Sequence, residues 1–186
     1  MWWRRQSSAQ IGRLAAAFAL AALAGGCFEP LYGARPAVDN ETVRDKLTSV
    51  EIAPIPAAKG QPAQRLAVEL RNDLEFDLNG GAGANAPTHK LTVNIQTTQL
   101  AIIIDSTSGR PDALIDSVVA AYTLTEIVTG KIVVKDTTFA HVDYDVPGAE
   151  QRFAKQRAQR EAEDRATQVV AESIRNRLAS YFVAGT

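Results

Sequence analysis

The chain has 186 residues, of which 46% are apolar, 22% are charged and 6% are aromatic. This length and composition fit one or at most two small globular domains. The 20 basic and 21 acidic side chains give a formal net charge of −1. Ordinary glycine and proline contents and a balanced charge disfavour a collagen-like chain, a wholly disordered chain and a strongly cationic protein that binds nucleic acid.

The first 26 residues differ from the rest of the chain. They contain Arg4, Arg5 and Arg13 but no acidic residue, and an apolar run follows over residues 14–23. A charged start, a short apolar run and small residues before a cleavage site are typical of a secretory signal peptide. About ten residues make roughly 15 Å of helix, which is half the thickness of a membrane's hydrocarbon core. We therefore expect residues 1–26 to direct export and not to form a transmembrane helix.

Cys27 is the only cysteine, so no intramolecular disulfide can form. Residues 23–27 read LAGGC and resemble a bacterial lipobox, in which small residues precede a cysteine that is diacylated on sulfur and becomes the new N-terminus. Two or three acyl chains anchor a protein stably to a membrane. We expect an S-diacylglycerol and an N-acyl group on Cys27 and no other cofactor. Because Phe28 and not aspartate follows, we expect an outer-membrane anchor with the body on the periplasmic side.

The segment after the cysteine predicts an extended tether over residues 27–47, since it has two prolines, a glycine and little periodicity. The alternation over residues 48–55 then predicts a first strand, which Pro54 and Pro56 end. The next segment changes period, and the spacing of its leucines predicts a helix over residues 62–78.

Three strands are predicted after this helix. Residues 90–104 alternate at first and become continuously apolar, residues 105–112 read as a loop, and residues 115–128 read as a long strand. A tight turn at 129–130 leads to a partner strand over 131–144.

The apolar pattern of this last strand slips between Val134 and Phe139, which predicts a β-bulge near Asp136 and Thr137. Such a bulge would shift the faces of the residues that follow it.

A helical apolar pattern occupies residues 150–182, after Pro147 and Gly148 interrupt the strand pattern. We expect the charged first half of this helix to project beyond the core and the second half to dock. The element order predicts an α+β fold of the type β-α-β-β-β-α. Its sheet is four-stranded, mixed and largely antiparallel, with two helices packed on one face and a more polar opposite face. Residues 48–186 form its single domain.

The inventory of catalytic groups is thin. His89 and His141 lack metal-ligand spacing, and the acidic residues of 73–77 are better explained as a solvated helix face. The glycines of residues 80–83 follow a helix, whereas phosphate-binding glycine loops follow a strand. We therefore expect no metal site and no catalytic residue, and the sequence favours a binding or structural protein.

One basic residue has an unusual position. Arg110 lies between Gly109 and Pro111 in the loop that joins two long strands, where its guanidinium is free to contact a phosphate or carboxylate. Lys131 and Lys135 lie on the following turn and strand, and the pattern alone assigns them no role.

Residues 27–33 read CFEPLYG. Together with the order strand, helix, three strands and long charged helix, they resemble the LptE family of LPS-assembly outer-membrane lipoproteins in its alphaproteobacterial form. The resemblance implies a non-enzymatic protein that sits in the lumen of the β-barrel LptD and helps lipopolysaccharide to reach the outer leaflet. It also implies that Arg110 binds lipopolysaccharide, and that Lys135 is a second basic contact.

Two alternatives remain open. An outer-membrane lipoprotein of the same layout could activate a peptidoglycan synthase or serve another envelope transporter. The residues after Cys27 span at most about 60 Å, which is marginal for that reach and ample for a plug. The other alternative, a lipid-anchored hydrolase, needs a nucleophile and a base that the sequence does not offer.

Overall fold

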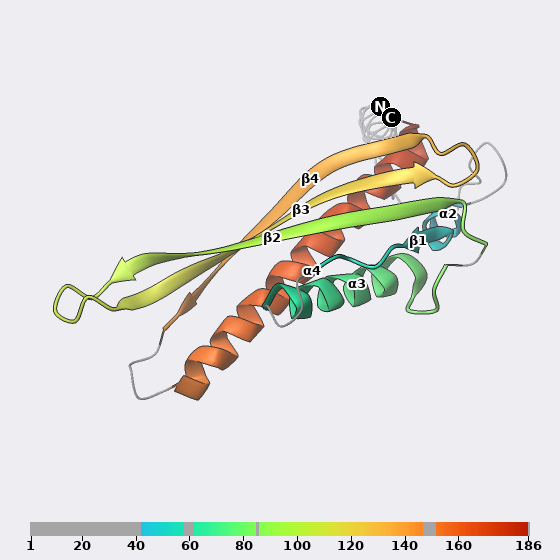
Figure 1. The fold of residues 1–186 in the computed structure, drawn as a ribbon. Coiled ribbons are helices and arrows are strands. Elements are labelled where there is room, and N and C mark those ends of the chain that lie inside the picture. Colours follow the sequence, from blue (N-terminus) through green and yellow to red (C-terminus); the bar gives the residue numbers. More distant parts are fainter. Residues whose placement is uncertain (1–41, 58–61, 85, 147–151, 186) are drawn as a thin grey trace, which may run out of the picture. The chain divides into compact units, whose positions relative to one another are not determined.

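A computed structural model describes residues 42–57, 62–84, 86–146 and 152–185 (Figure 1). Over these residues the element order is α2 (Val43–Thr48), β1 (Val50–Ile52), α3 (Pro62–Asn79), β2 (His89–Ile104), β3 (Pro111–Glu126), β4 (Ile132–Asp145) and α4 (Arg152–Ala184). The expected signal peptide, the proposed lipidation site Cys27 and the expected break at Pro147 and Gly148 lie outside the described residues.

The strands form one mixed sheet in the order β1-β2-β3-β4. β1 pairs with β2 in parallel through the α3 crossover, and β2, β3 and β4 form an antiparallel meander. Figure 1 shows α3 and α4 on the same side of this sheet. The predicted α+β fold with a four-stranded mixed sheet is therefore confirmed.

The predicted tether over residues 27–47 is too long, because the folded domain already begins with α2. A capping box starts this helix. The Thr42 hydroxyl accepts a hydrogen bond from the Asp45 amide (3.2 Å), and the Asp45 carboxylate accepts one from the Thr42 amide (3.0 Å). Val43 and Leu47 are buried in the core. The strand expected over residues 48–55 is correspondingly shortened to β1.

The leucine spacing of α3 places one stripe of side chains in the core, as predicted. This stripe comprises Leu66, Leu70, Leu74 and Leu78. Gly80 ends the helix in the left-handed region (φ +65°), with its amide donating to the Phe76 carbonyl at 2.9 Å.

The predicted bulge near Asp136 and Thr137 is wrong. β3 and β4 pair in unbroken register from Ala113 opposite Asp145 to Leu124 opposite Val134, and the register shifts only between Leu124 and Thr125. The apolar pattern slips for another reason. Asp136 forms an ion pair with Arg177 of α4 (3.5 Å), and Thr138 shares a hydrogen bond with Ser173 (2.8 Å). These polar residues keep their place on the core-facing side because α4 supplies polar partners there.

The second half of α4 docks, as predicted. The expectation that its first half projects beyond the core is wrong for the last turns of that half, where Ala162 and Ala166 are fully buried. Small and branched side chains of the second half are fully buried against the sheet and α3, namely Val170, Ala171, Ile174, Leu178 and Ala179. Near its start Phe153 is 84% exposed. Within the part of the chain that the structure describes, no helix combines the length and apolar character needed to cross a membrane.

The two faces of the sheet differ in composition. The face toward the helices carries apolar cross-strand rows such as Leu91, Leu124 and Val134. The opposite face carries mainly small polar side chains, including Thr92, Asn94, Gln96, Thr98, Ser117, Thr123, Lys135, Thr137 and His141. The helices of the described residues leave this polar face bare, which confirms the predicted contrast between the faces.

Candidate functional site: the hairpin tip and the bare sheet face

The tip of the β2–β3 hairpin is a short, hydrogen-bonded loop. The Asp105 carboxylate accepts hydrogen bonds from the amides of Thr107 (2.7 Å) and Ser108 (3.3 Å), and the Ser108 hydroxyl adds a third (3.0 Å). These bonds, that of Thr107 first, lower the pKa of Asp105 and keep the carboxylate charged. Gly109 supplies the left-handed conformation that closes the loop (φ +67°).

Arg110 is held at this tip by its backbone. Its carbonyl accepts from the Asp105 amide (2.9 Å) and its amide donates to the Ser108 hydroxyl (3.4 Å), while the residue is exposed. β3 begins immediately afterwards at Pro111, so the predicted loop over 105–112 is two residues shorter. The structure thus presents the guanidinium from a defined loop at the end of two paired strands.

An apolar segment precedes the tip. The last nine residues of β2, Gln96–Ile104, are all exposed, and we call them the distal segment. Each of its large apolar side chains is at least 49% exposed: Leu100 (66%), Ile102 (49%), Ile103 (56%) and Ile104 (61%). Exposed apolar side chains that adjoin one another mark binding surfaces in soluble domains. Beside Arg110, this segment complements a ligand that has both an anionic group and hydrocarbon.

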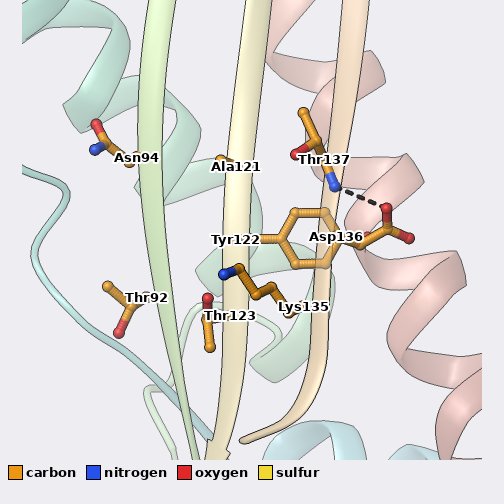
Figure 2. Close-up of a pocket in the computed structure, with 8 residues that line it drawn as sticks. All are labelled: Thr92, Asn94, Ala121, Tyr122, Thr123, Lys135, Asp136 and Thr137. Atoms are coloured by element: carbon orange, nitrogen blue, oxygen red, sulfur yellow. Dashed lines mark hydrogen bonds between the residues drawn. The ribbon is translucent and has the colours of Figure 1, made fainter.

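Lys135 occupies a different site, on the bare face of β4 opposite Thr123. It borders an open depression of about 510 Å³. Figure 2 shows its side chain over β3 beside Thr123, with Thr92 and Asn94 on the neighbouring strand. Most of the residues that line this open depression carry a polar group, which suits a hydroxylated or peptide surface better than a deeply buried small molecule.

The structure does not bring Arg110 and Lys135 together. Arg110 adjoins Pro111, whereas Lys135 pairs with Thr123 twelve residues further along β3. At about 3.3 Å per residue, roughly 40 Å of strand separates them. The two residues lie too far apart for a single anionic group to contact both.

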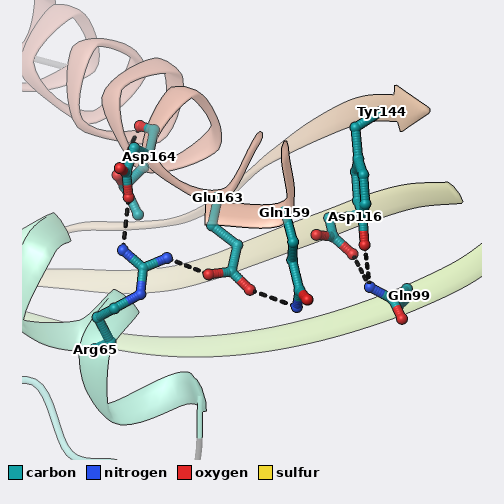
Figure 3. A network of polar contacts seen from close by, with 8 residues as sticks. Arg65, Gln99, Asp116, Tyr144, Gln159, Glu163 and Asp164 are labelled. Atoms are coloured by element: carbon teal, nitrogen blue, oxygen red, sulfur yellow. Dashed lines mark hydrogen bonds and ion pairs between the residues drawn. The ribbon is translucent and has the colours of Figure 1, made fainter. Parts of the chain in front are cut away.

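A polar network lies beneath the start of the distal segment, and sequence reasoning missed it. On one side, Arg65 of α3 contacts Glu163 and donates to Asp164 of α4 (2.7 Å), and Gln159 donates to Glu163 (3.0 Å) (Figure 3). Arg65 is 98 positions from Glu163 in the sequence, so no local pattern predicts this contact.

The other side of this network joins three strands. The Gln99 side-chain amide donates to the Asp116 carboxylate (2.9 Å) and to the Tyr144 oxygen (2.6 Å). Burial first, and then the charge of Glu163, raise the pKa of Asp116. Burial and the charges of Asp116 and Glu163 raise the pKa of Tyr144 to about 12. One sequence signal existed, because Asp116 shares its face of β3 with the apolar residues Val118 and Ala120.

His141 has a partner that the sequence did not suggest. Its Nδ1 lies 2.7 Å from the Ser117 hydroxyl on the adjacent strand, and its ring lies 5.0 Å from that of Phe139. Ser117 and His141 lie directly opposite each other on β3 and β4, and their side chains are on the exposed face of the sheet. This arrangement is a cross-strand contact that supports the sheet.

His89 lies elsewhere, at the start of β2. Its ring contacts Phe182 edge-on at 5.2 Å, and burial lowers its pKa. Among the described residues, no three potential metal-ligating side chains come together.

The family model "LptE: Lipopolysaccharide-assembly" matches residues 47–178 of this chain. No curated protein sequence matches it. Among solved structures, a lipoprotein from Caulobacter crescentus CB15 is 22% identical with a TM-score of 0.59, over 76% of this chain and 96% of the other. Lipoprotein B from Nitrosomonas europaea is 13% identical with a TM-score of 0.51, over 74% and 90%. These likenesses show that the fold is shared.

Proposed function

The chain belongs to the LptE family of lipopolysaccharide-assembly lipoproteins, and from this premise we propose that it is the non-enzymatic partner of the outer-membrane β-barrel LptD. In this role it helps the barrel to assemble and lipopolysaccharide to reach the outer leaflet. The match extends from α2 to the last turns of α4, so it includes the whole sheet.

The observation that carries the proposal is the pairing of a cation with exposed hydrocarbon at the hairpin tip. Arg110 offers a planar guanidinium to a phosphate oxygen, and the distal segment offers apolar side chains within the same hairpin. Lipopolysaccharide is an amphiphile with phosphate groups next to acyl chains. We therefore assign its headgroup to Arg110, and a separate, more polar contact to Lys135.

The bare sheet face supports the barrel partnership. The interior of a large transmembrane barrel is polar. Small hydroxyl and amide side chains such as Thr92, Asn94 and Thr137 can hydrogen-bond to such a wall without leaving buried charges unpaired. A domain with one apolar face already covered by helices and one polar face left open suits this environment.

The proposal includes the membrane anchor. Acylation of Cys27 would hold the domain at the periplasmic side of the outer membrane, next to a barrel embedded there. In cells labelled with radioactive palmitate, we expect label on the wild type and none on Cys27→Ser. An equally labelled Cys27→Ser variant would remove the anchor from the proposal.

Affinity isolation of the tagged, lipidated protein from detergent-solubilised outer membranes tests the partnership. After a stringent salt wash, we expect one large β-barrel protein in near-equal amount. Recovery of a peptidoglycan synthase instead, or of no partner, would contradict the barrel role while leaving the family membership intact.

Charge reversal at the tip tests the lipopolysaccharide contact. Arg110→Glu should weaken lipopolysaccharide binding by roughly tenfold, because it replaces a charge-assisted hydrogen bond with repulsion. Lys131→Glu is the matched control, since it reverses a charge at the other exposed hairpin turn. Equal affinity of Arg110→Glu and wild type would remove Arg110 from the site.

Lys135→Glu tests the second contact by the same binding measurement. Because Lys135 and Arg110 are far apart, their effects should add in the double variant. An unchanged affinity of Lys135→Glu would restrict the lipopolysaccharide site to the hairpin tip.

A further inference from the structure

The two edges of the sheet are exposed to different extents. β1 pairs only with His89, Lys90 and Leu91 of β2. Beyond Leu91, no strand of the described residues lies along the outer side of β2, although its inner side pairs with β3 as far as Ile104. The far half of β2 is therefore an edge strand, as is β4 on the other side.

The hydrogen-bonding direction along this edge follows from a single contact. The Leu91 carbonyl accepts a hydrogen bond from the Ala53 amide at 2.9 Å. The backbone N–H and C=O groups of Leu91 therefore point away from β3. In an antiparallel pair, alternate residues direct both their N–H and C=O groups outward. Thr97 and Gln99, which keep the same register with β3, consequently direct unpaired backbone groups to the open edge.

Only one of the two edges carries the usual protection against pairing. β4 has Lys135, Asp136, Asp143 and Asp145 along its length. The distal segment reads QTTQLAIII, with no charge and no proline. Natural edge strands carry charges, prolines or covers that prevent association, and an uncharged, β-branched edge is a template for another strand.

We propose that the distal segment pairs by strand addition with an extended, uncharged segment of a different protein. The identity of that protein rests on the proposed function, in which it is the outer-membrane barrel. The strands of a closed barrel have no free edge. The added strand is therefore a loop or a terminal segment of the barrel protein.

Lipid alone is a poor occupant of this edge. Acyl chains would cover Leu100 and the isoleucines, but they offer no partner to the outward N–H and C=O groups. Leaving such groups unpaired in hydrocarbon costs several kcal/mol each. An added strand satisfies these backbone groups. It leaves the apolar side chains on the faces of the sheet, where acyl chains can still contact them.

A second copy of this chain also fits poorly. The distal segment is polar from Gln96 to Gln99 and apolar from Leu100 to Ile104. Two copies that pair antiparallel over the whole distal segment, around a two-fold axis at Leu100, would place the apolar half of each strand against the polar half of the other. A foreign segment can match both halves, and the absence of charge in the distal segment selects an uncharged one.

Amide hydrogen exchange on the isolated complex tests the proposal. In the chain released from its partner and refolded, the inward amides of Gln96 and Thr98 should be protected, and the outward amides of Thr97 and Gln99 should exchange freely. In the complex, both outward amides should slow by roughly 100-fold, because they then bond to the added strand.

The other outcomes are distinct. A retained barrel with outward amides that still exchange freely overturns strand addition and leaves the proposed function standing. A chain isolated without a partner, whose outward amides exchange freely, overturns both. Protection that rises with the concentration of the purified chain, or that lipopolysaccharide micelles alone produce, assigns the edge to a second copy or to lipid and overturns the proposal.

A proline variant gives a second test. Thr97→Pro removes one outward N–H, which an edge strand tolerates, whereas Thr97→Val keeps it. We expect Thr97→Pro, and not Thr97→Val, to abolish the protection of Gln99 in the complex, with both variants as stable as wild type. If the Gln99 amide stays fully protected in Thr97→Pro, its protection in the complex does not come from an added strand, and the proposal is overturned.

Discussion

The near and far halves of β2 belong to one strand and share one partner strand, yet their surroundings differ. From His89 to Ile95, alternate side chains are buried beneath the helices, whereas from Gln96 to Ile104 every residue is exposed. Both halves pair with β3. Backbone pairing is therefore common to the two halves, and the cover supplied by α3 and α4 distinguishes them. The covered half stabilises the fold, and the bare half is available for binding.

A matched pair of leucine truncations tests this difference between the two halves of β2 most directly. Leu91 is fully buried in the near half, and Leu100 is 66% exposed in the far half. Leu91→Ala should lower the free energy of unfolding by about 3 kcal/mol, since it removes buried apolar surface and leaves a cavity. Leu100→Ala should change it by less than about 0.5 kcal/mol.

Urea unfolding followed by circular dichroism measures both variants. Equal destabilisation by Leu91→Ala and Leu100→Ala would mean that other residues of the chain cover the far half of β2. It would contradict the difference between a covered half and a bare half.

A second pair compares arginines. Arg65 ties α3 to Glu163, whose side chain is 9% exposed, while the Arg65 side chain is 37% exposed. Arg65→Met should cost about 1–2 kcal/mol, because it leaves a buried carboxylate with Gln159 as its remaining side-chain donor, a penalty reduced by the partial exposure of Arg65. Arg110→Met, the same change at the exposed tip, should leave thermal unfolding unchanged. A melting temperature that falls equally in both would contradict this difference.

The smallest expected effect concerns Asp116, which lies opposite Gln99 of the far half. Its pKa is raised above the ordinary value of 3.8, so the folded state binds a proton more tightly than the unfolded state does. Its ionisation therefore destabilises the fold as the pH rises through the folded pKa. Asp116→Asn should be more stable than wild type at pH 7, by no more than about 1 kcal/mol. This advantage should disappear as the pH approaches 3.8.

Unfolding measured from pH 4 to pH 8 checks this sign. A stability difference between Asp116→Asn and wild type that stays constant over the range would show that the carboxyl group has an ordinary pKa. The Asn side chain can still accept the hydrogen bond from Gln99, so this contact is kept in the comparison.

Much of the fold could be predicted because its signals are local. The four leucines of α3 and the alternation of Leu91, Val93 and Ile95 identify a helix and a strand without tertiary information. Helix α2 was missed because it has only six residues, too few for a convincing period. Its capping pair, Thr42 and Asp45, was the available signal.

The error at Asp136 has the opposite origin. An apolar pattern predicts faces only when polar residues point to solvent, and Asp136 and Thr138 instead meet Arg177 and Ser173 of α4. These partners lie more than thirty residues away, so the pattern alone resembled a bulge.

The order of the four strands and the two long helices, the apolar stripes of these helices and the position of Arg110 in a turn could be predicted from the sequence, since each depends on neighbours within a few residues. Tertiary packing alone shows which half of β2 is covered, that Arg110 and Lys135 lie far apart, and that the exposed Gln99 donates hydrogen bonds to the buried residues Asp116 and Tyr144. These features depend on where distant segments pack, and packing depends on the length and direction of whole elements. No local spacing encodes that information.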